Sequence, residues 1–178
     1  LSGLLEDMFG DSDPNKLTML TVGVKDPERF GIIERSVNGE LRSIVEKPNN
    51  PSSNRAVTGL YRFPAGAIDR ARYLKPSNRG ELEITDLLNT YIGSSATQVI
   101  ELPRGAVWFD AGTTESLYLA AEFVKAYQEA SGCRIGCPEE VALRLGWIDG
   151  NEFLDGMNHS QAASPYAQYL STLSPTDG

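Results

Sequence analysis

The sequence predicts an α/β fold built on a mixed sheet, with a helical appendage from about residue 131. Up to residue 130, short runs of apolar and β-branched residues alternate with segments of helical pattern, whereas the remainder shows helical patterns only. The chain has 178 residues, of which 40% are hydrophobic, so a sizeable core can form. We therefore expect an α/β part over residues 1–130 and a helical segment over 131–178.

The strands are predicted from short apolar runs bounded by turn residues. Residues 17–24 (LTMLTVGV) have the character of a buried strand. Asn38-Gly39 separates two further runs and is typical of a tight hairpin, because both residues tolerate positive φ. The remaining predicted strands cover 31–36, 41–45, 56–63, 97–102 and 106–109.

The helices are predicted from apolar residues at helical spacing. The longest begins after a cap at Thr113 or Thr114 and carries an apolar stripe of Leu117, Ala120, Ala121, Val124 and Tyr127. Shorter helices are expected at 65–74, 83–92, 138–145, 152–157 and 162–173. Residues 1–9 also have a helical pattern and lack an initial Met, so we expect the sequence to begin inside a longer protein.

Composition excludes several classes of function. The net charge is −8 without a Lys/Arg run, so no nucleic-acid partner is expected. No apolar stretch has the length that a bilayer crossing needs, and no signal peptide is visible. Cys133 and Cys137 are too few for a disulfide framework, and His159 is too distant in sequence to complete a zinc site. We expect a cytoplasmic protein with reduced thiols.

The usual catalytic motifs are also missing from the sequence. It has neither a Gly-x-Gly-x-x-Gly motif nor a Walker A loop. His159 lies in a polar stretch typical of a surface loop, where it would serve poorly in a Ser-His or Cys-His site. Chemistry that needs a nucleophilic side chain is therefore not indicated.

Two segments at strand ends suggest a sugar-phosphate site. Gly31 opens a strand after a loop, where glycine lets a ligand approach the backbone; an ordinary strand-start glycine is the alternative. Glu46-Lys47-Pro48 ends a strand, so Glu46 could accept sugar hydroxyls while Lys47 meets a phosphate. The alternative there is a solvated ion pair.

Two later segments carry a cation and a carboxylate. Arg79 opens RGELEITD and could hold a phosphate through two hydrogen bonds; alternatively, this run is a helix N-terminus whose acids complement the dipole. Asp110 lies where a strand runs into a capped helix and could hold Mg²⁺; the alternative is a turn aspartate.

Taken together and in this order, these segments resemble the glucose-1-phosphate thymidylyltransferases, which are sugar nucleotidyltransferases. The resemblance covers nearly the whole chain and is weakest over residues 1–16. It is carried by DPERFG (26–31), EKP (46–48), AVTGLY (56–61), RGELEITD (79–86), WFDAGT (108–113), CPEEVA (137–142) and GWI (146–148).

The resemblance implies a Rossmann-like nucleotidyltransferase sheet, incomplete because the N-terminal half is absent, and an enzyme that joins dTTP and glucose 1-phosphate into dTDP-glucose and pyrophosphate. It implies that the sugar phosphate attacks directly, with Mg²⁺ as cofactor and a homotetramer as the usual assembly. The implied roles are metal binding for Asp110, phosphate contacts for Lys47 and Arg79, sugar contacts for Glu46 and for the backbone at Gly31 and Val57, and pocket walls for Tyr61 and Trp108.

The chain departs from the family pattern by lacking the Gly-rich triphosphate loop. We therefore expect it to supply the sugar half of the site and to be nearly inactive alone. Two alternatives remain open. One is a related NDP-sugar pyrophosphorylase that uses a UDP- or CDP-sugar. The other is a non-catalytic regulatory or oligomerisation subunit.

Overall fold

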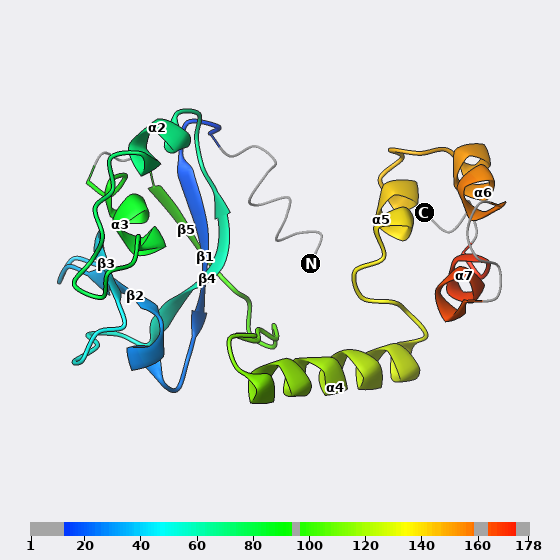
Figure 1. Cartoon of the computed structure of the whole chain (residues 1–178), viewed down its shortest axis with the longest axis horizontal. Helices are drawn as coiled ribbons and strands as arrows, with labels where there is room; N and C mark the ends of the chain where they lie inside the picture. The colour runs from blue at the N-terminus through cyan, green and yellow to red at the C-terminus, as the bar shows by residue number, and fades with distance from the viewer. Residues whose placement is uncertain (1–12, 94–96, 159–163, 174–178) are drawn as a thin grey trace. The chain divides into compact units, whose positions relative to one another are not determined.

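The computed structural model describes residues 13–93, 97–158 and 164–173 (Figure 1). The helix expected at residues 1–9 and the polar loop containing His159 lie outside the described residues. The chain divides into two compact units, residues 1–108 and 109–178. The expected division at residue 130, into a sugar-phosphate-binding part and a helical oligomerisation or regulatory segment, stays a prediction. The two compact units instead meet between residues 108 and 109, so the long helix before residue 130 groups with the second unit.

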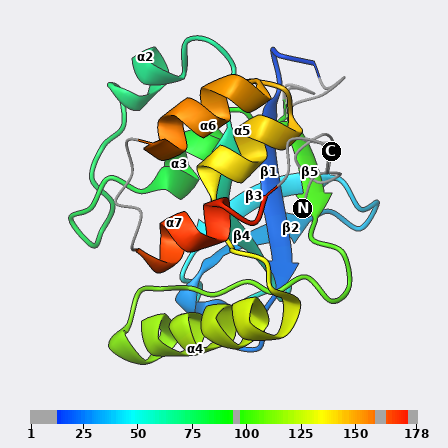
Figure 2. The ribbon, with the colours of Figure 1, turned by 90° about the vertical axis from the view of Figure 1, so that its right-hand side faces the viewer.

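The first unit is a five-stranded mixed sheet with the strand order β3-β2-β4-β1-β5. Figure 2 shows β1 with β5 beside it. Strand β1 pairs antiparallel with β4 and parallel with β5, which confirms the predicted mixed sheet. β2 pairs antiparallel with β3, so that Gly31 lies opposite Glu46. The strands are β1 (Leu17–Gly23), β2 (Gly31–Arg35), β3 (Leu41–Glu46), β4 (Arg55–Arg62) and β5 (Thr97–Glu101).

The hairpin between β2 and β3 forms where the sequence predicts it. Gly39 has a φ of 83°, and its amide donates to the carbonyl of Ser36 at 2.9 Å. Glycine is favoured at this turn because a Cβ would disfavour the left-handed conformation. The turn lies at one end of the hairpin, and the Gly31–Glu46 pair lies at the other.

Helix α3 (Ile84–Asn89) covers the sheet on the side that forms the main core. It is shorter than the predicted 83–92, and hydrogen-bonded turns continue the chain to Ile92. Leu87 and Leu88 of this helix pack with residues from β1 to β4, and Tyr91 completes the cluster. The other members of this core are Leu17, Met19, Ile33, Ile44 and Val57. A short helix, α2 (Ala67–Ala71), lies in the predicted 65–74 segment.

Asn89 connects α3 to the edge strand β3. Its Oδ1 accepts from the Ile44 amide at 2.8 Å, and its Nδ2 donates to the Ile44 carbonyl at 2.7 Å. Both backbone groups of Ile44 are therefore satisfied without another strand on this side. Because Ile44 lies two residues before Glu46, Asn89 also fixes the end of β3.

Asn89→Ala is expected to lower the free energy of unfolding by about 1–3 kcal/mol, since it leaves half-buried backbone groups of Ile44 without their partner. Urea denaturation would measure the loss, and hydrogen exchange should show faster exchange of the Ile44 amide. Asn50→Ala, in the exposed loop after β3, is the matched control and should change stability by less than about 0.5 kcal/mol. Equal stability of the two variants would contradict the anchoring role.

The strand predicted over residues 106–109 is wrong. This segment is irregular, and its Ala106 amide donates to the Pro103 carbonyl at 3.0 Å. Trp108 instead donates from its indole Nε1 to the Thr58 carbonyl at 3.2 Å. An apolar run becomes a strand only with a partner, and no described strand pairs with it.

The second unit is helical in its described residues, as predicted for the appendage. Thr113 caps α4 (Thr114–Ser131) in a reciprocal capping box with Ser116. The predicted apolar stripe of α4 includes no buried residue. Helices α5 (Pro138–Arg144), α6 (Gly150–Asn158) and α7 (Pro165–Leu170) share a small core of Cys137, Phe153 and Leu170. Cys133 and Cys137 are free thiols.

Candidate functional site

Glu46 and Lys47 lie where β3 ends, as the sequence predicts. The Lys47 amide donates to the Phe30 carbonyl at 3.0 Å, which keeps the end of β3 beside the start of β2. Lys47 has a φ of 44°, unusual for a residue with a side chain, and the following proline removes the next backbone donor. Lys47 Nζ lies 3.9 Å from Glu46 Oε1.

Arg79 lies on a tight loop before α3. The Gly80 amide donates to the Ser77 carbonyl and the Ser77 amide to the Glu81 carbonyl, both at 2.8 Å. Gly80 has a φ of 77°, a conformation in which glycine is favoured. The Arg79 amide donates to Ser77 Oγ at 3.1 Å, so the loop holds Arg79 close to Glu46 at the end of β3.

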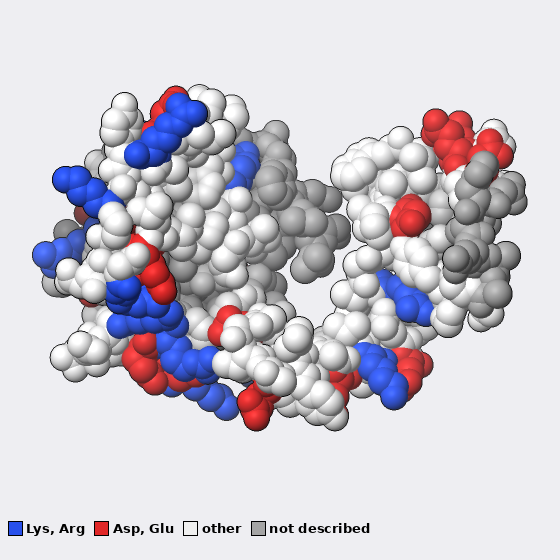
Figure 3. Space-filling model, in the orientation of Figure 1, with Lys and Arg blue, Asp and Glu red and all other residues white. Residues whose placement is uncertain are grey.

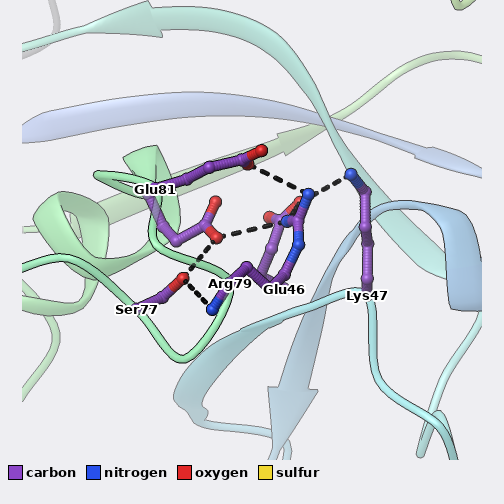
Figure 4. Close-up of polar contacts among 6 residues, drawn as sticks. Glu46, Lys47, Ser77, Arg79 and Glu81 are labelled. Carbon is purple, nitrogen blue, oxygen red and sulfur yellow. Dashed lines mark hydrogen bonds and ion pairs between the residues drawn. The ribbon is translucent and has the colours of Figure 1, made fainter.

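The guanidinium of Arg79 is surrounded by carboxylates (Figure 4). Its Nη1 lies 3.2 Å from Glu83 Oε1 and 3.8 Å from Glu46 Oε1, and its Nη2 lies 3.0 Å from Glu81 Oε2. Ser77 Oγ donates to the same Glu83 oxygen at 2.8 Å. The structure thus brings three of the predicted residues, Glu46, Lys47 and Arg79, into one charged cluster.

A cavity of about 290 Å³ opens beside this cluster. Its lining includes the charged residues Glu46, Arg79 and Glu83, and also Thr85. The cavity therefore offers carboxylate oxygens that accept hydrogen bonds from hydroxyl groups and a cation that can bind an anion. The volume is near the lower end of the range for small-molecule sites, about 300–1,000 Å³. The full lining comprises Ile44, Val45, Glu46, Ser77, Asn78, Arg79, Glu83, Thr85 and Asp86.

Gly31 packs against the Glu46 carboxylate, together with the buried side chains of Thr85 and Val57. A Cβ at this position would meet Thr85 Cγ2 at 2.8 Å, Val57 Cγ2 at 3.0 Å and Glu46 Oε2 at 3.2 Å. These distances leave no room for a side chain, so glycine is required here by close packing. Gly31 therefore packs close to both Glu46 and Val57, but neither Gly31 nor Val57 is among the residues that line the cavity, so their contacts with a ligand stay a prediction.

Burial is the largest cause that raises the pKa of Glu46 above its ordinary value of 4.5, and the nearby Glu83 raises it further. Lys47, Arg79 and a hydrogen bond with Thr85 act in the opposite direction without cancelling the rise. The cluster therefore holds a carboxylate whose charged form is partly disfavoured. A neutral sugar hydroxyl that donates to Glu46 would stabilise this charged form.

Because the folded state raises the pKa of Glu46, the folded chain binds this proton more tightly than the unfolded chain. The charged form of Glu46 therefore lowers the free energy of unfolding. This loss is absent below about pH 4.5 and is complete above the raised pKa of the folded chain. We expect Glu46→Gln to be more stable than wild type at pH 7, with a difference that shrinks as pH falls through this window. Urea midpoints against pH would measure it. Glu40→Gln is the exposed control, and an equal pH profile for both variants would contradict the effect.

Tyr61 lies on β4, and the indole of Trp108 donates to the Thr58 carbonyl of the same strand. Tyr61 is half-buried with its ring centroid 5.9 Å from that of Phe63, and burial is the main cause that raises its pKa. The negative charge of Glu46 also raises the pKa of Tyr61. Trp108 meets Phe30 edge-on at 5.3 Å between centroids. Both side chains make packing contacts, and a role as pocket walls stays a prediction.

Asp110 belongs to the second unit, whereas Lys47 and Arg79 belong to the first, so their proximity stays a prediction. Both Asp110 carboxylate oxygens lie 3.3 Å from where a Gly112 Cβ would be, so glycine leaves space beside the carboxylate. Among residues 13–93, 97–158 and 164–173, no group of three or more His, Cys, Asp or Glu residues could hold a metal. A single carboxylate fits Mg²⁺, which usually takes one or two carboxylates and completes its shell with substrate phosphates.

Sequence reasoning did not assign the polar residues that support Arg79. Ser77 and Glu83 hold it, and Thr85 lies against Gly31 and Glu46. Glu83 occupies the N-cap position of α3 but makes no side-chain capping bond. The acids of RGELEITD are thus not merely partners of the helix dipole. The sequence carries no signal for this role of Glu83, because a spacing of four residues predicts a contact only within a helix and Arg79 lies on a loop.

The charged groups of the first unit are of mixed sign. On the face shown in Figure 3, Lys and Arg side chains lie against Asp and Glu side chains without forming a broad field of one sign. Such a surface differs from the basic face of a typical nucleic-acid binder. Among the described helices, none is both long and apolar enough to cross a membrane.

Comparison with known proteins shows the class to which this mixed sheet belongs. Residues 4–127 match the family described as nucleotidyl transferase, and the chain belongs to this family. Its relatives include a glucose-1-phosphate thymidylyltransferase from Neisseria meningitidis, 45% identical over 88% of this chain and 54% of that protein. Another, from Xanthomonas campestris, is 42% identical over 92% of this chain and 55% of that protein.

A solved structure from Bacillus anthracis, assigned as a glucose-1-phosphate thymidylyltransferase in complex with sucrose, is similar in sequence and fold. It is 34% identical with a TM-score of 0.54, over 68% of this chain and 46% of that chain. The chain spans about half the length of the curated relatives it matches. The resemblance found in the sequence is therefore confirmed, and the activity of the whole protein is a matter for proposal.

Proposed function

We propose that this chain carries the sugar-phosphate side of the active site of a glucose-1-phosphate thymidylyltransferase. The observation that supports the proposal best is the cavity in which Glu46 and Arg79 face the same space, with Lys47 beside them. A carboxylate recognises sugar hydroxyls, while a lysine and an arginine recognise a phosphate. One cluster thus offers both kinds of contact that a glycosyl phosphate needs.

In the proposed reaction, a phosphate oxygen of glucose 1-phosphate attacks the α-phosphorus of dTTP. A new P–O bond forms as the bond to pyrophosphate breaks, so the products are dTDP-glucose and pyrophosphate. Lys47 and Arg79 hold the attacking phosphate, orient it and balance its charge. Glu46 orients the sugar through its hydroxyls. This chemistry needs no nucleophilic side chain.

Mg²⁺ is the proposed cofactor, and Asp110 is the residue proposed to hold it. When bound, the ion supplies positive charge to phosphate oxygens. Mn²⁺ can serve as a paramagnetic probe for this site. We expect it to broaden the NMR signals around residues 110–112 in wild type and to lose this effect in Asp110→Asn. Asp149→Asn is the control, and unchanged broadening in Asp110→Asn would remove the assignment.

Isothermal titration of the 178-residue chain with glucose 1-phosphate tests the substrate side of the proposal. We expect saturable binding that glucose 6-phosphate does not reproduce, because the anomeric phosphate and the hydroxyls must reach their partners together. Pyrophosphate release from dTTP should be slow or absent with this chain alone, because the contacts to the triphosphate are proposed to come from outside it. A chain that binds neither sugar phosphate would contradict the proposal and favour the non-catalytic subunit.

The proposal also includes the oligomeric state, the nucleotide base that the enzyme uses and the cellular location. A homotetramer is proposed from the family resemblance, and a cytoplasmic location from the small number of cysteines. The named relatives favour thymidine over uridine or cytidine as the base. Competition of dTTP with UTP and CTP in the complete enzyme would separate these alternatives.

A further inference from the structure

The charged cluster around Arg79 has five members, and their side chains differ in exposed fraction. The members are Glu46, Lys47, Arg79, Glu81 and Glu83. Glu83 is the deepest, with 10% of its side chain exposed, and Arg79 is intermediate at 39%. Glu81 is outermost at 60%. The two carboxylates that contact Arg79 most closely are therefore unlike in environment, because one is held inside and the other faces solvent.

The two carboxylates also bind different edges of the guanidinium. Glu83 lies at Nη1 and is itself held by the hydroxyl of Ser77, whereas Glu81 lies at Nη2. A guanidinium binds carboxylate and phosphate oxygens with the same N–H donors. A phosphate that approaches the Nη2 edge therefore competes with the carboxylate of Glu81 for this part of the guanidinium.

We propose that Glu81 is a displaceable placeholder that occupies the phosphate-binding edge of Arg79 in the unliganded chain, while Glu83 is the positioning residue that fixes the other edge. This inference rests on the proposed function and deepens it. The loop geometry supports the exchange, because the bond between the Ser77 amide and the Glu81 carbonyl holds the backbone of Glu81 while its side chain stays exposed. Glu81 can then release Arg79 by a change of rotamer, without moving the loop.

Removal of the placeholder should strengthen binding. Exposed ion pairs contribute little, so Glu81→Gln is expected to tighten binding of glucose 1-phosphate by about two- to fivefold. The same factor should apply to inorganic phosphate, because both ligands would use the same edge of Arg79. Glu83→Gln should weaken both ligands, because Arg79 loses the partner that orients it. A tightening is informative, since general damage to the fold would only weaken binding.

The experiment is isothermal titration of wild type, Glu81→Gln, Glu83→Gln and Glu40→Gln with both ligands at one low salt concentration. Glu40→Gln removes the same charge at the opposite end of the β2–β3 hairpin, so it measures the general effect of net charge. A Glu81→Gln chain that binds no tighter than Glu40→Gln overturns the inference, and wild-type binding of glucose 1-phosphate would still support the proposed function. Tighter binding of inorganic phosphate by Glu81→Gln, without binding of glucose 1-phosphate by any variant, would support the placeholder and contradict the function.

Discussion

Replacement of Arg79 by glutamine is expected to weaken binding of glucose 1-phosphate by about ten- to hundredfold, since a hydrogen bond to a charged group contributes about 1.5–3 kcal/mol. The variant removes the positive charge and the planar arrangement of N–H donors that matches a phosphate. It also leaves Glu46 and Glu83 with less positive charge beside them. Isothermal titration would measure the loss.

Two further variants separate the charge of Arg79 from its shape. Arg79→Lys keeps the charge but loses the paired donors, so we expect an intermediate affinity. Arg72→Gln removes an arginine whose side chain is 74% exposed on the neighbouring segment, and it should bind like wild type. If Arg79→Gln binds within twofold of Arg72→Gln, Arg79 does not hold the phosphate.

Gly31→Ala is expected to lower the free energy of unfolding by about 1–3 kcal/mol, the usual cost of overpacking a filled interior. The new methyl group would meet Thr85 of α3 at 2.8 Å and Val57 of β4 at 3.0 Å, and both of these neighbours are buried. It would also press on the Glu46 carboxylate at 3.2 Å. We therefore expect weaker binding of glucose 1-phosphate together with the lower stability.

Gly23→Ala is the matched control for this steric effect. Gly23 ends β1, and a Cβ there would lie 3.5 Å from the end of the Arg55 side chain, an ordinary contact. Its free energy of unfolding should stay within about 0.5 kcal/mol of wild type in urea denaturation. Equal stabilities for the two alanine variants would show that the space beside Gly31 is not tightly filled.

The parts of the fold that depend on local sequence were predictable. Strand β1, the hairpin at Gly39 and the cap of α4 at Thr113 each follow from residues that are adjacent in the chain. The run at 106–109 failed because its apolar pattern needs a partner strand that the described residues do not supply. The apolar pattern of a segment indicates its preference for a strand, but it does not indicate which strand will pair with it.

The candidate site was predictable in its principal charges but not in their support. Glu46 and Lys47 stand at the end of β3, and Arg79 stands in the loop before α3. Glu83, Ser77 and Asn89 act through contacts that only the folded chain creates, such as the bonds of Asn89 to Ile44 across 45 residues. A polar residue in a helical pattern gives no sign of which backbone group it will meet.

The central claim is that the cavity beside Glu46 and Arg79 receives a glycosyl phosphate. An NMR titration of the ¹⁵N-labelled chain with glucose 1-phosphate tests it most directly, because every backbone amide reports its own surroundings. We expect the largest shifts at Gly31, at Glu46 and Lys47, and over residues 77–85, with saturation at a common concentration. Saturable shifts confined to other residues, or none at all, would contradict the claim.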